Sequence, residues 1–201
     1  MTIAARYDDI LDATVTVLAR RGFHQARIRE IADAAQLSLA GLYHYVRGKD
    51  ELVFLALARA LDDLIVALDR ALAAAHTPED KLLALIRTHL DFALTRGAEM
   101  KVINRDYETL PEPQLNEIVR KRGEYLRRGI AILAELDPHG RSHEALLSAT
   151  ILLLGMLNGV ATRPFLRTAD GAATLAKEIG ALFLHGFLQR TTTIRERRAH
   201  S

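Results

Sequence analysis

The stretch from Arg27 to Leu52 constrains the fold of this chain more than any other part of it. Its apolar residues recur at helical spacing in two short runs, separated by a break at Gln36-Leu37. The recurring positions are Ile28, Ile31, Ala32 and Ala35 in the first run and Leu39, Leu42 and Val46 in the second. Ser38 can cap the second helix, because its hydroxyl accepts a hydrogen bond from a free amide there, and Arg47-Gly48 ends it. Two short helices joined by a tight turn predict a helix-turn-helix, whose second helix enters the major groove of DNA.

At these residues the sequence resembles the tetracycline-repressor (TetR) family of bacterial transcription regulators. The matching residues are Ile31-Ala32, Ala35, Leu37-Ser38, Gly41-Leu42-Tyr43, Tyr45-Val46, Lys49 and Glu51-Leu52. The departures are Arg27, where threonine is usual, Gln36, where glycine is usual, Leu42, which follows Gly41 directly, and Tyr45, where histidine is commoner. The resemblance implies an all-α fold of about nine helices. A three-helix helix-turn-helix headpiece would precede a helical ligand-binding and dimerisation domain.

Composition agrees with an all-helical protein, because aromatic residues make up only 5% of the chain while alanine and leucine are abundant. The chain has no cysteine, which excludes disulfides, zinc–cysteine sites and thiol nucleophiles and is compatible with a cytoplasmic location. Its N-terminus, MTIAARYDDI, lacks the pattern of a signal peptide. A net charge of +2 does not by itself identify a nucleic-acid binder, so the expectation of DNA binding depends on the motif.

Apolar periodicity, together with glycine and proline stop signals, predicts the other helices. They cover residues 4–22, 49–75, 79–95, 101–110, 114–136, 141–163 and 172–189. We divide the chain into a helix-turn-helix DNA-binding domain at residues 1–50, an effector-binding and dimerisation domain at 51–190, and a basic tail at 191–201. The tail carries Arg195, Arg197 and Arg198, and a solvated chain end is favoured over a DNA contact there.

Residues 145–162 carry no charge and are long enough to span a bilayer. Ser148, Thr150 and Asn158 dilute this segment, and no second segment of its kind exists in the sequence. We therefore expect no membrane partner but a helix buried by its own domain and by a second subunit. The resemblance also implies a homodimer, with its contacts on the last two helices.

Such a dimer would read a pseudo-palindromic double-stranded operator in major grooves about 34–36 Å apart or a multiple of that distance. Tyr43 and His44 are the expected polar base readers, and family analogy favours Tyr43. Phosphate contacts from neighbouring residues would fix the register. Packing inside the headpiece is the alternative role for Tyr43 and Tyr45. The expected DNA-binding residues are Arg27, Gln36, Ser38, Leu39, Ala40, Tyr43, His44, Tyr45 and Lys49.

The resemblance further implies a small-molecule effector site in the larger domain, bounded by the helices between residues 79 and 163. Such sites are mostly apolar, with a few polar groups that orient the ligand. The expected effector-binding residues are His89, Phe92, Ile103, Asn104, Tyr107, Tyr125, Met156, Asn158 and Arg163. Each apolar member has ordinary core packing as its alternative role, and the Asn158 amide has a structural hydrogen bond as its own.

Three segments, residues 104–111, 122–126 and 155–164, resemble the subgroup of the family that regulates lipid and steroid breakdown and senses acyl-coenzyme A thioesters. The tryptophan-rich segment of that subgroup is replaced here by Gly159-Val-Ala-Thr. Cations for the phosphates of an acyl-CoA are available at Arg105, Arg120, Arg127, Arg128 and Arg163, although a solvated helix face is the favoured interpretation of that row. A small apolar or aromatic compound is the alternative effector.

Two other functional classes remain as alternatives, a helical enzyme and an adaptor without specific DNA binding. His139 and His143 have the spacing of a metal pair, but Pro138 and Gly140 place His139 in a turn. Glycine-rich phosphate loops, GxSxG and HExxH are all missing from the sequence. We therefore expect no catalytic residues, no metal and no cofactor.

Overall fold

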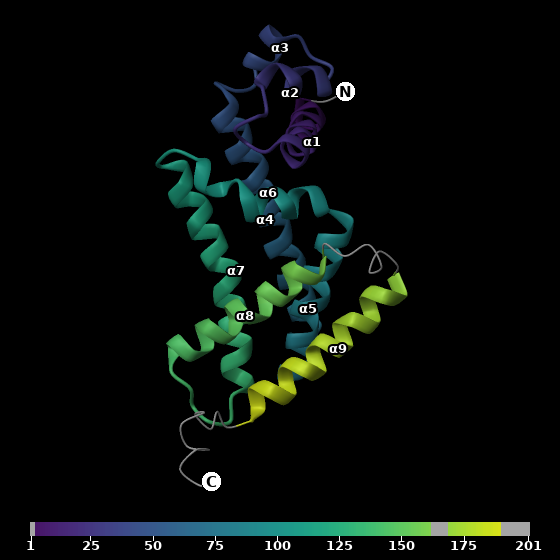
Figure 1. The fold of residues 1–201 in the computed structure, drawn as a ribbon, viewed down its shortest axis with the longest axis vertical. Helices are drawn as coiled ribbons and strands as arrows, with labels where there is room; N and C mark the ends of the chain where they lie inside the picture. The colour runs from purple at the N-terminus through teal and green to yellow at the C-terminus, as the bar shows by residue number, and fades with distance from the viewer. Residues whose placement is uncertain (1–2, 162–168, 190–201) are drawn as a thin grey trace. The chain divides into compact units, whose positions relative to one another are not determined.

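The computed structural model of the chain describes residues 3–161 and 169–189, and these residues fold into helices joined by short turns (Figure 1). The elements are α1 (Ile3–Arg21), α2 (Ile28–Ala34), α3 (Leu39–Tyr43), α4 (Lys49–Ala73), α5 (Pro78–Thr95), α6 (Gly97–Arg105), the 3-10 turn η1 (Tyr107–Thr109), α7 (Gln114–Leu136), α8 (His143–Ala161) and α9 (Ala169–Leu188). Over the residues described there are nine α-helices and no strand, which confirms the predicted all-α class.

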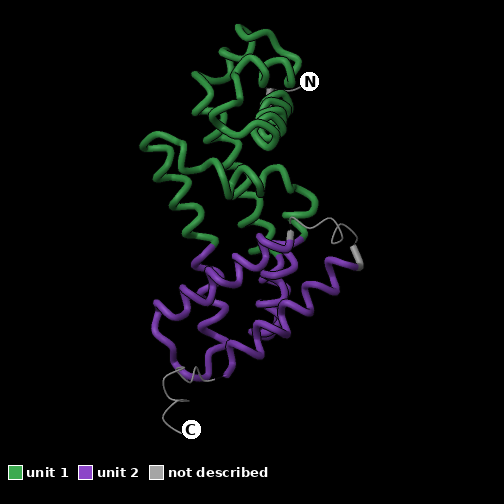
Figure 2. Tube along the Cα trace, viewed as in Figure 1, with its two compact units in different colours: residues 1–70, 91–125 green, residues 71–90, 126–201 purple. Residues whose placement is uncertain are grey.

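The helices group into two compact units, each built from two stretches of sequence (Figure 2). Unit 1 comprises residues 1–70 and 91–125, and unit 2 comprises residues 71–90 and 126–201. These units follow packing within the chain, whereas the domains expected from sequence are three consecutive segments. The expected basic tail at 191–201 lies outside the described residues.

Helix boundaries follow the sequence signals closely, with two differences. Helix α3 ends at Tyr43, whereas the sequence predicts a helix that continues to Arg47-Gly48. The other difference concerns α6, which ends at Arg105 and not at residue 110. The sequence predicts that Gly97 ends a helix and that the next one starts at Lys101. Instead α5 ends at Thr95, and α6 begins at Gly97 itself, with Arg96 as its N-cap residue. Glycine lowers helix stability mainly at interior positions, so it can stand at the first position of a helix.

The core of the headpiece, within unit 1, is formed by fully buried side chains of four helices. They are Ile10 and Leu18 of α1, Ile31 of α2, Leu42 of α3 and Leu52 of α4. A smaller cluster contains Leu11, Val15 and Ala56, with Tyr7, Leu55 and Ala98 packed against it. Burial of each such aliphatic side chain contributes about 1.5–3 kcal/mol. The short helices α2 and α3 therefore depend on packing for their stability, since isolated helices of this length do not persist in water.

In unit 2, α7 and α8 approach each other closely at Gly129. A Cβ atom on Gly129 would lie 2.5 Å from Cγ2 of Thr150, so only glycine fits at this crossing. Thr150 is fully buried and its hydroxyl donates to the carbonyl oxygen of Leu146 at 2.8 Å. The inward face of α8 consists of Leu146, Thr150, Leu153 and Leu157, all of them buried.

Candidate nucleic-acid interface and effector site

The turn between α2 and α3 has its geometry set by Gln36. This residue has a φ of 55°, in the left-handed region that favours glycine. Its N–H donates to the carbonyl of Asp33 at 3.0 Å, and the N–H of Leu37 donates to the carbonyl of Ala32 at 2.9 Å. These two bonds form a Schellman motif, in which a left-handed residue ends a helix. The conformation explains why glycine is usual here, and the Gln36 carbonyl is held by Nη2 of Arg6 at 3.1 Å.

Helix α3 begins as its sequence predicts. The Oγ atom of Ser38 accepts a hydrogen bond from the N–H of Gly41 at 3.0 Å. Leu42 is 0% exposed and Val46 is 3% exposed, so these two residues anchor the helix and the turn that continues it into the headpiece core. The opposite edge of α3 is therefore directed outward.

None of the nine expected DNA-binding residues is buried in the structure. Tyr43 is 49% exposed, which disfavours the alternative that it packs inside the headpiece, and His44 is also exposed. Tyr45, Leu39 and Lys49 are half-buried, while the remaining four, Arg27, Gln36, Ser38 and Ala40, are exposed. The N–H of Arg27 donates to Oε2 of Glu30 at 3.0 Å, which caps the start of α2 and leaves the guanidinium at the surface. Sequence reasoning passed over Arg47, an exposed cation between Tyr45 and Lys49.

Lys49 has a structural role that its position in the motif does not reveal. Its ammonium group donates to the carbonyl oxygens of Phe23 at 3.0 Å and Ala26 at 3.3 Å. It also lies 4.2 Å from the centre of the Phe23 ring, within the range of a cation–π contact. An ammonium group has three donors, so a phosphate contact by the third is compatible with these bonds.

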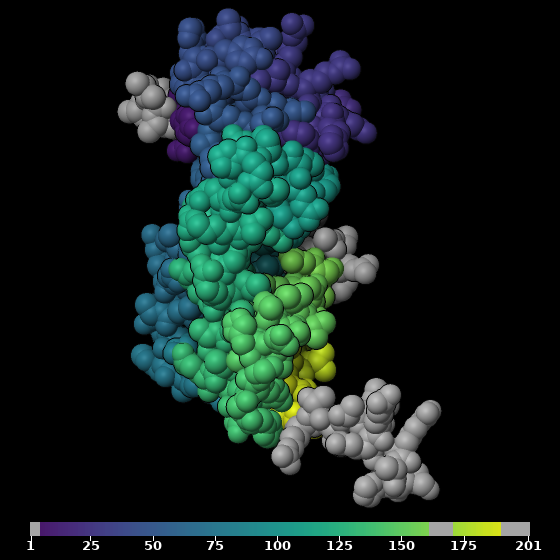
Figure 3. All heavy atoms as spheres, turned by 90° about the vertical axis from the view of Figure 1, so that its left-hand side faces the viewer, coloured from purple at the N-terminus to yellow at the C-terminus, as the bar shows by residue number. Residues whose placement is uncertain are grey.

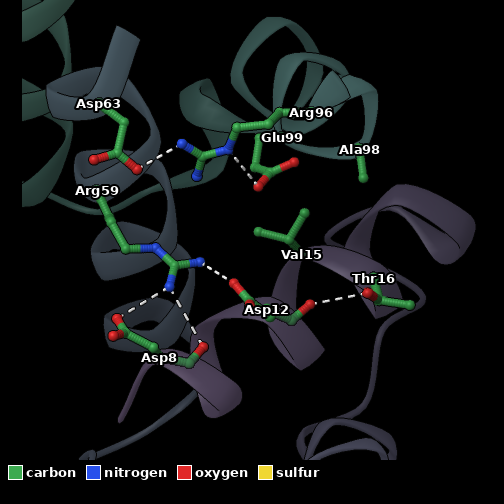
Figure 4. Close-up of a pocket in the computed structure, with 9 residues that line it drawn as sticks. All are labelled: Asp8, Asp12, Val15, Thr16, Arg59, Asp63, Arg96, Ala98 and Glu99. Carbon is green, nitrogen blue, oxygen red and sulfur yellow. Dashed lines mark hydrogen bonds and ion pairs between the residues drawn. The ribbon is translucent and has the colours of Figure 1, made fainter. Parts of the chain in front are cut away.

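A groove lined by charged residues lies between α1, α4 and the start of α6 within unit 1 (Figure 4). The Arg59 guanidinium of α4 pairs with Asp12 and, at 3.2 Å, with Asp8, both on α1. Arg96 pairs with Asp63 of α4 at 2.6 Å and with Glu99 of α6 at 3.0 Å. These cross-element pairs, which the sequence pattern did not reveal, tie α1 and α6 to α4.

In unit 2, two of the expected effector-binding residues are hydrogen-bonded partners. Nε2 of His89 on α5 lies 3.2 Å from Oδ1 of Asn158 on α8. An amide oxygen only accepts, so the imidazole donates from Nε2. His89 is 3% exposed, and this burial lowers the pKa of its imidazole from 6.5 to about 4, partly offset by the bond to Asn158. The imidazole is therefore neutral at physiological pH, and it makes a polar contact with the half-buried Asn158 amide.

Five other expected effector-binding residues belong to unit 1. Phe92, Ile103 and Tyr125 are buried, and burial raises the pKa of the Tyr125 phenol. Asn104 is exposed, while the half-buried Tyr107 ring stacks against the Arg122 guanidinium, which is 4.2 Å from the ring centre. Arg163 lies outside the described residues.

Two of the arginines considered for phosphate binding, Arg105 and Arg120, form ion pairs with carboxylates of the same chain. Arg120 pairs with Glu117 at 2.6 Å and also with Glu124, all on the surface of α7. Arg105 pairs with Asp106 at 2.8 Å, and Arg127 is exposed. The arrangement of Arg120 agrees with the solvated helix face favoured from sequence.

The outer face of α8 carries exposed apolar residues, and Figure 3 shows α8 at the molecular surface with part of α9 visible beside it. Ile151 and Leu152 of α8 are 54% and 67% exposed, and Leu182 of α9 is 71% exposed. A groove of about 650 Å³ between the two helices is lined by Arg141, Ala145, Ser148, Ala149, Leu152, Met156, Leu182, Phe183, Gly186 and Phe187. The structure thus places Met156 on this groove.

Residues 143–160 of α8 are long and apolar enough to cross a membrane by length and composition, and only 22% of that window is buried. It is the one such helix among the residues described. A single candidate of this kind is weak support for a membrane span, because helices that cover a subunit interface have the same composition.

His139 contacts the end of α9. Its Nε2 atom lies 3.0 Å from the carbonyl oxygen of Leu188. The Arg141 guanidinium donates to the carbonyl of Phe187, and it lies 4.4 Å from the centre of the Phe187 ring. The turn between α7 and α8 therefore caps the C-terminus of α9, a structural role for His139.

Two family models match this chain. Residues 10–56 match the model described as "Bacterial regulatory proteins, tetR family". Residues 75–162 match the "Tetracyclin repressor-like, C-terminal domain". The first match contains α2, α3 and the exposed edge described above, and the second contains α5, α6, α7 and α8.

Two relatives from Mycolicibacterium smegmatis are named transcription factors. The transcriptional activator FasR is 30% identical over 149 residues, which cover 74% of this chain and 67% of FasR. The transcriptional repressor KstR2 is 28% identical over 133 residues, which cover 66% of this chain and 65% of KstR2, so the match spans just under two thirds of that relative. Both relatives are regulators and neither is an enzyme.

Solved structures share the fold over nearly the whole chain. A TetR-family regulator from Bordetella parapertussis has a TM-score of 0.83 and 24% identity, covering 93% of this chain and 98% of that one. AibR, in complex with isovaleryl coenzyme A and operator DNA, has a TM-score of 0.75 and 20% identity, covering 88% and 97%. At these identities the likeness establishes the fold.

Proposed function

The chain belongs to the TetR family of transcriptional regulators, and we propose that it binds a specific double-stranded operator as a homodimer and responds to a small-molecule effector. The observation that carries the DNA-binding part is the orientation of α3. Buried Leu42 and Val46 hold the helix by one side, and Tyr43 on the other side is 49% exposed. An anchored short helix with an exposed aromatic and polar edge is the form of a recognition helix.

In this proposal, Tyr43 and His44 touch base edges, and Leu39 and Ala40 approach thymine methyl groups from the N-terminus of α3. Arg27, Gln36, Ser38, Tyr45 and Lys49 contact phosphates, which fixes the register without reading sequence. Exposure of the Arg27 guanidinium at the start of α2 supports its part in this arrangement.

DNA binding is tested by selecting duplexes from a random library with the wild-type protein and measuring affinity for the selected sequence by fluorescence anisotropy. We expect Tyr43→Ala to fold normally, since the side chain is half exposed, and to bind the selected duplex at least tenfold more weakly, a loss of about 1.4 kcal/mol. Val66→Ala, an exposed residue on α4, is the matched control. Wild-type affinity in Tyr43→Ala would reject the assignment of the reading edge.

The dimer is supported by the exposed apolar face of α8 and α9. Ile151, Leu152 and Leu182 leave a surface that a soluble monomer would expose to water at a cost of about 25 cal/mol per Å². We propose that a second copy covers this face around a twofold axis, giving a four-helix interface. The two headpieces would then meet successive major grooves of one operator.

For the effector, the proposal centres on the pair formed by buried His89 and half-buried Asn158 in unit 2. A neutral hydrogen-bonded pair is the kind of polar group that orients a ligand in a mostly apolar site. AibR was solved with isovaleryl coenzyme A and a FadR regulator from Bacillus subtilis with stearoyl-CoA, so acyl-CoA thioesters are the first compounds to test. A small apolar or aromatic compound is tested next. It needs no cations for phosphate groups, and Arg105 and Arg120 are already paired with carboxylates.

Effector action is a difference in affinity between two states, so a true effector must change DNA affinity. Isovaleryl-CoA and stearoyl-CoA are titrated against the operator-bound protein, with free coenzyme A as the control. We expect release by the effective acyl-CoA and none by coenzyme A alone. A thioester that binds the protein but leaves operator affinity unchanged is not the effector.

Proteins that act on DNA in this way work in the cytoplasm, which is where we propose this chain functions.

A further inference from the structure

The turn between α1 and α2 is held by charged side chains that belong to α4 and α6. Phe23 lies in this turn, and both of its backbone polar groups have charged partners. Its N–H donates to Oδ1 of Asp106 at 3.4 Å, and its carbonyl accepts from Nζ of Lys49 at 3.0 Å. The turn is thus bonded on one side to the C-cap residue of α6 and on the other to the first residue of α4.

Asp106 is itself fixed by the residue that precedes it. Nε of Arg105 donates to Oδ1 of Asp106 at 2.9 Å and Nη2 donates to Oδ2 at 2.8 Å, while the Asp106 side chain is only 5% exposed. Nη2 of Arg105 also donates to the carbonyl of Leu18 in the last turn of α1 at 2.5 Å. A cation at a helix C-terminus is favourable because the helix dipole is negative there.

Gly22 brings the backbone close to this pair. It has a φ of 77°, and a Cβ at this position would lie 3.6 Å from Cζ of Arg105. The end of α1, the Phe23 amide and the C-terminus of α6 therefore meet around one ion pair. All of these residues belong to unit 1.

We propose that Arg105 and Asp106 are positioning residues for operator binding. They fix the α1–α2 turn, and through it the orientation of α2 and of α3, which the Gln36 turn joins rigidly to α2. This inference rests on the operator binding proposed above.

The first variant is Asp106→Asn, because electrostatics and positioning predict opposite signs for it. Removing a negative charge makes the protein more cationic, and long-range attraction to phosphates would then leave operator binding equal or tighter. Loss of the ion pair with Arg105 loosens the turn, so positioning predicts binding about tenfold weaker. Affinity is measured on the duplex selected by the wild-type protein, and thermal unfolding verifies that the variant is folded.

The second variant, Arg105→Lys, keeps the charge but loses the planar fork that reaches both Asp106 and Leu18. It is expected to weaken operator binding to a similar extent, about tenfold. Arg120→Lys is the matched control, because the Arg120 ion pairs remain within α7. If Asp106→Asn does not fold, Arg105→Lys alone decides the question.

Salt dependence separates a positioning residue from one that touches DNA. Loss of one phosphate contact changes the slope of log affinity against log salt by about 1. We expect both variants to keep the wild-type slope at lower affinity, whereas Arg47→Ala should change the slope if this exposed cation contacts a phosphate. The inference is overturned if the folded variants bind like wild type, or if Arg105→Lys changes the slope. If the wild-type protein selects no duplex at all, the proposed function fails as well, so the two failures are distinguishable.

Discussion

The pKa of His89 makes a quantitative prediction about stability. Burial lowers the pKa from 6.5 in the unfolded chain to about 4 in the folded protein. Between these two pKa values the unfolded chain binds a proton at His89 that the folded protein does not bind. The contribution of His89 to the free energy of unfolding is therefore fully present above pH 6.5 and is lost as the pH falls toward 4. At pH 5 the pH lies about one and a half units below the pKa of His89 in the unfolded chain. Each unit corresponds to about 1.4 kcal/mol, so the free energy of unfolding falls by about 2 kcal/mol.

Carboxylates and the other histidines also titrate in this range, so the comparison requires a variant. We compare urea unfolding of the wild-type protein and of His89→Gln at pH 8, 7, 6 and 5. The wild-type advantage over His89→Gln should shrink by about 2 kcal/mol from pH 8 to pH 5. Parallel stability profiles for the two proteins would refute the assignment of His89 as a buried neutral imidazole.

Three further predictions concern the fold and its assembly. Gln36→Gly should raise stability by about 1 kcal/mol, because glycine adopts a φ of 55° without strain, and an unchanged or lower unfolding midpoint would contradict this. Gly129→Ala should destabilise the protein by about 1–3 kcal/mol, because the added methyl group overlaps with Thr150. Adding Thr150→Ser should restore most of the loss, because serine lacks the overlapping methyl group and keeps the hydroxyl. A double variant no more stable than Gly129→Ala would argue against the close crossing. Leu152→Asp combined with Leu182→Asp should give a folded monomer in sedimentation experiments, and a species of unchanged mass would show that this face does not form the dimer.

Local signals in the sequence were sufficient for the fold class and for α3. The family, the all-α class and the non-enzymatic nature of the protein were identified correctly from the helix-turn-helix stretch. Ser38 caps α3, and Leu42 and Val46 face inward, as their spacing predicts. These features depend on residues three or four positions apart, and such contacts are visible in a sequence.

Contacts between distant residues were beyond the reach of sequence reasoning. Lys49 was assigned to a phosphate by its place in the motif, while its bonds to Phe23 and Ala26 span 26 and 23 residues. The bond between Phe23 and Asp106 spans 83 residues, and no periodicity indicates which aspartate reaches that turn. Periodicity identifies an apolar face but not its partner, so it could not separate Met156 on the α8–α9 groove from residues of the interior.

Two members of the expected effector-binding set contact each other in the structure. His89 and Asn158 were both chosen from the sequence as polar groups in apolar helices, and they are hydrogen-bonded across 69 residues. The bond is compatible with both roles of Asn158, a structural partner and a ligand contact, since a hydrogen-bonded amide can exchange its partner for a ligand group. Only ligand titration separates these two roles.

A hydroxyl-radical footprint on the selected duplex tests the central claim most directly. Two copies of α3, each held outward by Leu42 and Val46, predict two protected patches whose centres are about 34–36 Å apart or a multiple of that distance. At a protein concentration near the wild-type Kd, both patches should be much fainter in Tyr43→Ala than in the wild-type protein, because the variant binds at least tenfold more weakly. A single patch, uniform protection along the duplex, or an unchanged pattern in Tyr43→Ala would contradict the account.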